Sequence, residues 1–204
     1  MTHFNIAIDG PSGAGKSTIA RALAQQLQSI YIDTGAMYRA IGLYAAERGL
    51  EITDKDGVIA LLPEIRLELR FEEGAQHILV NDRDVSGLIR TESASMWASA
   101  VSAIPEVRAF LLEFQRSFAK NNHVIMDGRD IGTVVFPDAE LKIYMTADAA
   151  VRAERRYEEL KAKGDNVNYE EILENVISRD KADMSRAISP LRKADDAVVL
   201  DNST

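Results

Sequence analysis

The stretch that decides the fold is Gly10-Pro11-Ser12-Gly13-Ala14-Gly15-Lys16-Ser17-Thr18. It follows a short apolar run, residues 4–9, and precedes a helical pattern of apolar residues from Ile19 to Leu27. A Gly-x4-Gly-Lys-Ser pattern between a strand and a helix predicts a loop whose backbone N–H groups surround phosphate oxygens. Lys16 is expected to reach the β and γ phosphates from solvent, and Ser17 to be a magnesium ligand. The alternative, an accidental Gly-rich turn, leaves this strand–loop–helix context unexplained.

Strands alternate with helices along most of the chain. The expected strands are residues 4–9, 30–33, 123–127, 141–145 and 197–200, and the expected helices cover about 19–28, 35–48, 105–120, 147–163 and 169–187. Strands separated by helices predict an α/β fold with a parallel sheet that is covered on both faces. Thr34 and Thr146 are the expected N-caps of the helices that follow them.

A different pattern interrupts this alternation. A short helix is expected to begin at Thr53 or Asp54 and to end before Pro63. Residues 65–71 then alternate apolar and charged side chains, which indicates a half-exposed antiparallel strand. A turn at residues 73–74, a returning strand at 77–80 and a second turn at 81–82 complete the predicted β-rich segment. We therefore predict an inserted subdomain at about 35–105.

The charge balance limits the classes of partner. The 204 residues carry a formal net charge of −8, whereas affinity for the nucleic acid backbone requires an excess of Lys and Arg. The 16 Arg residues outnumber the 8 Lys residues, and the forked guanidinium group suits phosphates and carboxylates. This favours a small anionic substrate held by individual Arg side chains, with solvated helix faces as the alternative.

Other compositional features exclude several kinds of site. The chain has no Cys and three scattered His residues, which excludes disulfides, thiolate metal sites and a Cys nucleophile and makes a His-based metal cluster unexpected. No apolar run reaches the roughly 18 residues of a membrane helix, and the start of the sequence lacks the basic segment of a signal peptide. A reducing, cytoplasmic location is the expectation.

Two polar loops follow expected strands. Asp33-Thr34-Gly35 leads into a helix with Arg39 one turn inside, an arrangement that suits an anion at the helix N-terminus. Asp127-Gly128-Arg129-Asp130 follows an apolar strand at the sheet edge where α/β proteins bind ligands. A plain helix cap with a surface Arg and a structural salt bridge are the respective alternatives.

Two later helices carry clustered Arg residues. One contains Arg152-x-x-Arg155-Arg156, and the other places Arg179, Asp183 and Arg186 on one face through spacings of four and three. Each pattern alone is also typical of a solvated helix face.

Taken together, these stretches resemble bacterial cytidylate (CMP) kinases. The resemblance is carried by residues 10–18, 33–39, 98–108, 127–137 and 179–186, and it runs in register over essentially the whole chain. The insert near residues 60–85 separates this family from adenylate kinases, which share the phosphate-binding loop. The resemblance implies phosphoryl transfer from ATP to CMP or dCMP with Mg²⁺, in pyrimidine nucleotide metabolism.

The resemblance also implies roles for individual residues. The ATP-binding residues would be Gly10, Pro11, Ser12, Gly13, Ala14, Gly15, Lys16, Ser17 and Thr18. The acceptor phosphate would be held by Thr34, Arg39, Arg129 and Arg186, the sugar hydroxyl by Asp183, and the cytosine base by Ser99, Arg108 and Asp130, with Arg179 also in the CMP site. Arg155 and Arg156 would lie in a lid over the donor phosphates, and the catalytic residues would be Lys16, Arg129, Arg155, Arg156 and Arg186.

The implied architecture is a P-loop parallel β-sheet core flanked by helices, formed by residues 1–204 as one kinase domain. An inserted NMP-binding subdomain at about 35–105 would contain the antiparallel strands, and a helical lid would cover about 150–168. The implied enzyme is a monomer that binds ATP and CMP or dCMP but neither nucleic acid nor membranes. Members of this family usually continue into a further helix beyond the position of Thr204.

Three other functions are consistent with the loop alone. A related kinase could phosphorylate another nucleoside monophosphate or a small hydroxylated acid. A GTPase switch would need a guanine-binding Asn-Lys-x-Asp element, which the sequence lacks, and its Asp54-Lys55-Asp56-Gly57 stretch is expected to begin a helix rather than to end a strand. An inactive kinase kept as an interaction protein is disfavoured because Lys16, Ser17 and the Arg residues are all present.

Overall fold

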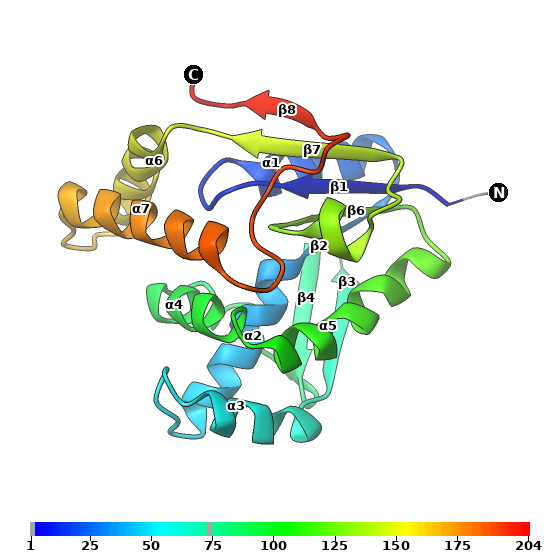
Figure 1. The fold of residues 1–204 in the computed structure, drawn as a ribbon. Helices are drawn as coiled ribbons and strands as arrows, with labels where there is room; N and C mark the ends of the chain where they lie inside the picture. The colour runs from blue at the N-terminus through cyan, green and yellow to red at the C-terminus, as the bar shows by residue number, and fades with distance from the viewer. Residues whose placement is uncertain (1–2, 73–74) are drawn as a thin grey trace.

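A computed structural model describes residues 3–72 and 75–204 of the chain. Its core is a five-stranded sheet in the order β2-β6-β1-β7-β8, with every neighbouring pair parallel (Figure 1). The strands are β1 (Asn5–Asp9), β2 (Ile30–Asp33), β6 (Val124–Gly128), β7 (Leu141–Thr146) and β8 (Val198–Asp201). The predicted parallel α/β sheet is therefore confirmed.

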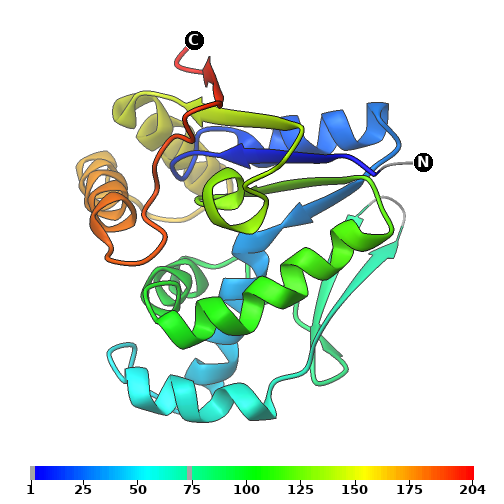
Figure 2. The ribbon, with the colours of Figure 1, turned by 45° about the vertical axis from the view of Figure 1, so that its right-hand side comes forward.

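Helices cover both faces of the sheet (Figures 1 and 2). The α-helices are α1 (Lys16–Gln26), α2 (Thr34–Glu47), α3 (Lys55–Leu61), α4 (Glu92–Val101), α5 (Pro105–Ser117), α6 (Ala149–Ala162) and α7 (Tyr169–Ser185). Short 3-10 turns at Leu62–Glu64 and Phe118–Lys120 and a π turn at Ile131–Val135 complete the helical segments. Within the described residues, no helix combines the length and the apolar character needed to cross a membrane.

Successive residues of the central strands pack into two different cores, as the alternation of side chains in a strand requires. Ile8 and Ile125 pack with α1 on one face of the sheet. Ala7 and Met126 pack on the other face, with α2, α4 and α5. Because both faces are buried, the strands are continuous apolar runs, which is the pattern expected of a parallel sheet.

The antiparallel sheet between α3 and α4 has the order β3-β4-β5. Its strands are β3 (Leu67–Glu72), β4 (Ala75–Val80) and β5 (Arg83–Asp84). Asn81 and Asp82 form the turn between β4 and β5 with φ of 50° and 67°, a conformation that these residue types tolerate well. The turn predicted at residues 73–74 lies outside the described residues.

Two predicted helix caps are wrong. The residue that caps α2 is Asp33, whose carboxylate accepts a hydrogen bond from Ala36 N at 3.0 Å, and Thr34 is already the first helical residue. Thr146 remains in β7 because it pairs with Asp201 of β8, so the next helix begins only after Asp148. At Thr146 pairing with a distant strand sets the boundary, and local residue preference does not contain that information. At α2 the cap is local, and Asp33 and Thr34 are both residue types that favour a helix cap.

Helices α2 and α4 approach so closely that a glycine is required between them. A Cβ atom on Gly42 of α2 would lie 2.5 Å from Cβ of Trp97 in α4. Both residues are buried, so neither helix can yield without disturbing the core that they share.

Gly42→Ala is therefore expected to lower the free energy of unfolding by about 1–3 kcal/mol, because overpacking costs more than the helix preference of Ala returns. The matched control is Gly87→Ala, since a Cβ at Gly87 meets no atom within 4 Å. Urea unfolding should leave this control within about 0.5 kcal/mol of the wild type. Equal stability of the two variants would contradict the close packing of α2 on α4.

Candidate active site

A cleft of about 780 Å³ opens at the carboxyl ends of the parallel strands. Figure 1 shows α6 and α7 beyond the ends of β1 and β7, with α4 and α2 facing them. The cleft brings together most of the residues predicted to form the site. Its lining includes Ser12, Gly13, Gly15, Lys16, Ser17, Thr18, Thr34, Arg39, Ser99, Arg108, Arg129, Asp130, Arg155, Arg156, Arg179, Asp183 and Arg186. Gly10, Pro11 and Ala14 are not part of the lining and shape the loop beneath it.

The loop between β1 and α1 is held tightly against β7. Gly10 has a φ of 150°, and a Cβ at this position would lie 1.9 Å from the backbone oxygen of Met145. Only glycine permits that approach. The loop then enters α1 at Gly15, with the first backbone N–H groups of the helix free to bind an anion.

Lys16 is not exposed to solvent, contrary to expectation. Its side chain folds back over its own loop, Nζ donates a hydrogen bond to Pro11 O at 2.7 Å, and the residue is 7% exposed. Burial lowers the pKa of Lys16 to about 7, and the nearby charge of Arg129 acts in the same direction. A phosphate in the loop would favour the charged form and offset this desolvation.

Asp127 is a site residue to which the sequence analysis gave no role, although it named the polar loop that Asp127 begins. Asp127 is the next-to-last residue of β6, and its two carboxylate oxygens accept hydrogen bonds from the hydroxyl groups of Ser17 at 2.8 Å and Tyr31 at 3.1 Å. Burial raises the pKa of Asp127 to about 6, with Asp33 contributing in the same direction. The sequence held a signal for this role, because Asp127 lies near the end of an apolar strand, at the sheet edge where the phosphate loop begins.

A second buried acid, Asp9, supports the loop after β6. Its carboxylate accepts hydrogen bonds from the backbone N–H groups of Ile131 and Gly132, each at 2.7 Å. These bonds fix the chain immediately after Arg129 and Asp130. Burial nevertheless raises the pKa of Asp9 to about 6, because it outweighs the two hydrogen bonds.

Arg129 and Arg186 converge on Asp183. Arg129 Nε lies 2.8 Å from one oxygen of Asp183, and Arg186 Nη1 lies 3.7 Å from the other. Burial alone would raise the pKa of Asp183, but Arg129 and Arg186 hold it below its ordinary value. Arg179, one turn earlier on α7, donates a hydrogen bond to Ser95 O of α4 at 3.3 Å. These contacts join α7 to the loop after β6 and to α4.

Arg108 and Asp130 form a buried ion pair close to Arg186, which approaches Ser102 Oγ at 3.5 Å. Arg108 also donates a hydrogen bond to Ser102 O at 3.1 Å, and Ser99 lines the cleft from the same helix turn. Thr34 has its hydroxyl bonded to Asp127 O at 2.8 Å, so this side chain connects the start of α2 to the end of β6.

The Arg residues of α6 occupy three different environments. Arg155 donates a hydrogen bond to Asn202 O at 2.7 Å, whereas Arg156 pairs with Glu92 of α4 at 2.9 Å and with Glu159 of its own helix. Arg152, which the sequence-based assignment omitted, is 4% exposed and contacts the phosphate loop directly. Its guanidinium donates a hydrogen bond to Ser12 O at 3.0 Å and pairs with Asp180 of α7. The sequence alone does not show that Arg152 contacts the loop while Arg155 and Arg156 contact other segments, because these contacts depend on how distant segments pack.

Donor groups dominate this cleft. Among the residues that the structure describes, Arg39 Nε, Arg108 Nε and Arg186 Nη2 are buried guanidinium nitrogens that have no hydrogen-bond partner. Orphaned buried donors are rare in proteins and point to a ligand rich in acceptors. The geometry suits two anionic groups, one in the loop beside Lys16 and one among the Arg residues.

A family model matches almost the whole chain. Residues 6–204 match the model described as "Cytidylate kinase". The chain is 51% identical to a cytidylate kinase of Carboxydothermus hydrogenoformans over 98% of this chain and 90% of that protein. It is 49% identical to a cytidylate kinase of Flavobacterium johnsoniae over 100% of this chain and 90% of that protein.

A solved structure supports the fold independently. An uncharacterized protein from Eubacterium ventriosum superposes with a TM-score of 0.50 at 11% identity, over 98% of this chain and 90% of that chain. At this identity the likeness is one of fold alone.

The buried carboxylate of Asp9 predicts a pH dependence of stability. Its folded-state pKa of about 6 lies above the ordinary 3.8, so at pH 5 the folded protein holds a proton that the unfolded chain has released. Stability from this group is therefore present at low pH and is lost as the pH rises from about 4 to about 6. The loss corresponds to about 3 kcal/mol.

Urea unfolding of the wild type and of Asp9→Asn across pH 4–7 measures this contribution. The variant is expected to be less stable at low pH, since an amide accepts fewer hydrogen bonds, but the stability difference should shrink by up to about 3 kcal/mol as Asp9 ionises. A difference that does not change with pH would show that Asp9 has an ordinary pKa.

Proposed function

The chain belongs to the cytidylate kinase family, and on that premise we propose how it transfers the terminal phosphoryl group of ATP to CMP or dCMP. The products are ADP and CDP or dCDP. The observation that carries the assignment of roles is the single cleft in which the loop around Lys16 faces the Arg cluster of Arg39, Arg129 and Arg186. Such a cleft can hold a donor and an acceptor phosphate together.

The loop of residues 10–18 is the proposed donor site. Its backbone N–H groups and Lys16 would bind the ATP phosphates, as in other loops of this pattern. Ser17 and Asp127 fit Mg²⁺, because their oxygens converge at 2.8 Å and Mg²⁺ binds through one or two protein oxygens together with substrate phosphates. When bound, Mg²⁺ supplies charge neutralisation to the donor phosphates.

The Arg cluster is the proposed acceptor site. Thr34, Arg39, Arg129 and Arg186 would hold the CMP phosphate, and Asp183 would bind the sugar hydroxyl. Arg179 would also lie in the CMP site. Arg129 and Arg186 are already oriented by Asp183, so little side-chain freedom is lost when the phosphate binds.

Ser99, Arg108 and Asp130 would select the base. A carboxylate accepts a hydrogen bond from the 4-amino group of cytosine, and a guanidinium donates to N3 and O2. Uracil presents O4 and an N3–H at the same positions, so it would oppose each of these groups with a mismatched partner. The ion pair between Arg108 and Asp130 supports this proposal because it holds donor and acceptor side by side.

The reaction needs positioning and charge stabilisation more than covalent participation by the protein. An oxygen of the CMP phosphate attacks the γ-phosphorus, and the bond from that phosphorus to the β–γ bridging oxygen breaks as ADP leaves. A phosphate oxygen is a sufficient nucleophile, so no general base is required. Lys16, Arg129 and Arg186 would stabilise the charge of the transferring group.

Two segments would close over the substrates. Arg155 and Arg156, in a lid at about 150–168, would approach the donor phosphates and exclude water, which competes as an acceptor. The subdomain at about 35–105 would close on the CMP side. The proposed setting is a monomer in the cytoplasm, and the absence of Cys from the sequence agrees with a reducing compartment.

The function is tested by ADP release from ATP with CMP, dCMP, UMP and AMP in turn. CMP and dCMP should give the largest kcat/KM, and Lys16→Met should lower kcat by about 10³-fold or more, because the lost cation compensates charge in the transition state. Since Lys16 is buried, circular dichroism must show that the variant is folded. Preferred turnover of UMP or AMP would overturn the proposed substrate.

Base selection gives a separate prediction. Asp130→Asn and Arg108→Met should each lower kcat/KM for CMP at least about tenfold and narrow the ratio of CMP to UMP activity, while the KM for ATP barely changes. Each substitution leaves a buried charge without its partner, so thermal unfolding must accompany the kinetics. A uniform loss with an unchanged ratio would assign both residues to structure or to phosphate binding.

A further inference from the structure

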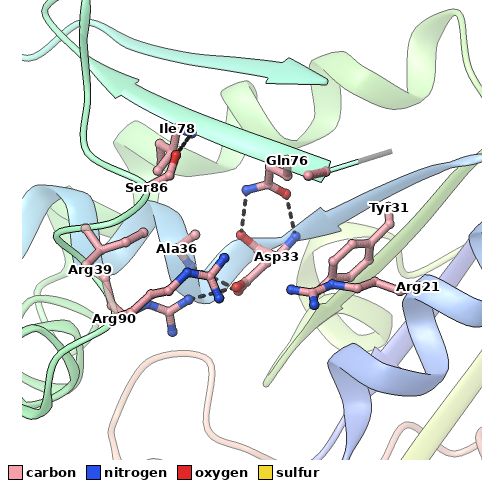
Figure 3. A pocket seen from close by; sticks show the side chains of 11 residues that line it. Arg21, Tyr31, Asp33, Ala36, Arg39, Gln76, Ile78, Ser86 and Arg90 are labelled. Atoms are coloured by element: carbon pink, nitrogen blue, oxygen red, sulfur yellow. Dashed lines mark hydrogen bonds and ion pairs between the residues drawn. The ribbon is translucent and has the colours of Figure 1, made fainter. Parts of the chain in front are cut away.

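Strand β2 lies at the edge of the parallel sheet, so one side of its backbone has no neighbouring strand. At Asp33, the last residue of β2, a side chain from the antiparallel sheet takes that place. Gln76 of β4 accepts a hydrogen bond from Asp33 N through Oε1 at 2.8 Å and donates one to Asp33 O through Nε2 at 3.3 Å (Figure 3). A single side-chain amide thus reproduces both hydrogen bonds of a strand neighbour.

The residue held in this way also orients a guanidinium. One carboxylate oxygen of Asp33 accepts a hydrogen bond from Ala36 N, and the other lies 2.7 Å from Arg39 Nη2. The backbone of Asp33 is therefore fixed by Gln76, and its side chain fixes the start of α2 and Arg39 together. Figure 3 shows Gln76, Asp33 and Arg39 in this continuous arrangement.

Arg39 has space to move if this arrangement is lost. A cavity of about 200 Å³ lies beside it, bounded by Arg21, Arg39, Gln76 and Arg90 among others. Arg21 and Arg90 carry the same charge as Arg39 and would not hold it in place. Among the described residues, Asp33 is the one hydrogen-bond partner of the Arg39 guanidinium, so the position of the guanidinium depends on that ion pair.

We propose that Gln76 is a positioning residue that holds Arg39, through Asp33, where Arg39 binds the acceptor phosphate. The proposal rests on the acceptor role of Arg39 given under the proposed function. It makes the antiparallel sheet contribute to CMP affinity through one amide group that does not itself touch the substrate.

The test is the steady-state kinetics of Gln76→Ala. The KM for CMP should rise about tenfold, while kcat and the KM for ATP stay within about twofold, because only acceptor binding depends on Arg39. Gln76→Met keeps the length and the apolar stem of the side chain but lacks the amide. It should show the same rise in the KM for CMP, which would exclude loosening of the sheet by the smaller alanine as the cause. His77→Ala, at the next position of β4 and therefore on its opposite face, is the matched control and should have the KM of the wild type.

A double-mutant cycle with Arg39→Ala separates positioning from a merely structural role. If Gln76 acts through Arg39, then adding Gln76→Ala to Arg39→Ala should raise the KM for CMP by less than twofold further. A tenfold rise in both backgrounds, or an unchanged KM in the Gln76 variants, would overturn the proposal. Turnover of CMP by the wild type tests the proposed function separately, so the two failures are distinguishable.

Discussion

Three aspartates at the carboxyl ends of three adjacent strands organise this molecule. Parallel pairing places Asp33 opposite Asp127 and Asp9 opposite Gly128, so the ends of β2, β6 and β1 meet at one edge. Each carboxylate then holds a different segment: Asp9 fixes the loop after β6, Asp127 binds the first turn of α1 through Ser17, and Asp33 caps α2. The register of the sheet thereby sets the relative positions of the donor and acceptor sites.

This arrangement costs stability. Burial raises the pKa values of Asp9 and Asp127 to about 6, and it lowers that of Lys16 to about 7. All three groups are therefore poorly stabilised in their charged forms before any nucleotide is present. These groups lower the free energy of unfolding, and they lie where a bound phosphate and its cation would supply the missing charge. Such a loss of stability is typical of functional sites.

The sequence was sufficient to predict the features that depend on local pattern. The strand–loop–helix unit around Lys16, the parallel sheet and the antiparallel strands all follow from apolar periodicity and glycine spacing, which are properties of neighbouring residues. Most features that it could not predict depend on distant contacts. Thr146 stays in a strand because of β8, and Arg152 is selected from its triplet by Ser12. The burial of Lys16 is local but was also missed, because it depends on the side chain folding back over its own loop to Pro11. Asp127 had a usable signal in its place at the end of an apolar strand.

The excess of Arg over Lys has a structural reason in this cleft. A guanidinium has five N–H donors in a fixed fork, so it can bind a carboxylate that orients it and still offer N–H groups to a phosphate. Arg39 uses Nη2 for Asp33, and Arg186 uses Nη1 for Asp183, whereas Arg39 Nε and Arg186 Nη2 have no partner among the described residues. A lysine in either place would direct its one compact ammonium group to the carboxylate. It would have no second edge of N–H donors for the phosphate. Because the orienting acid and the substrate bind different edges of the same group, the acceptor phosphate can enter without breaking the ion pairs that positioned the site for it.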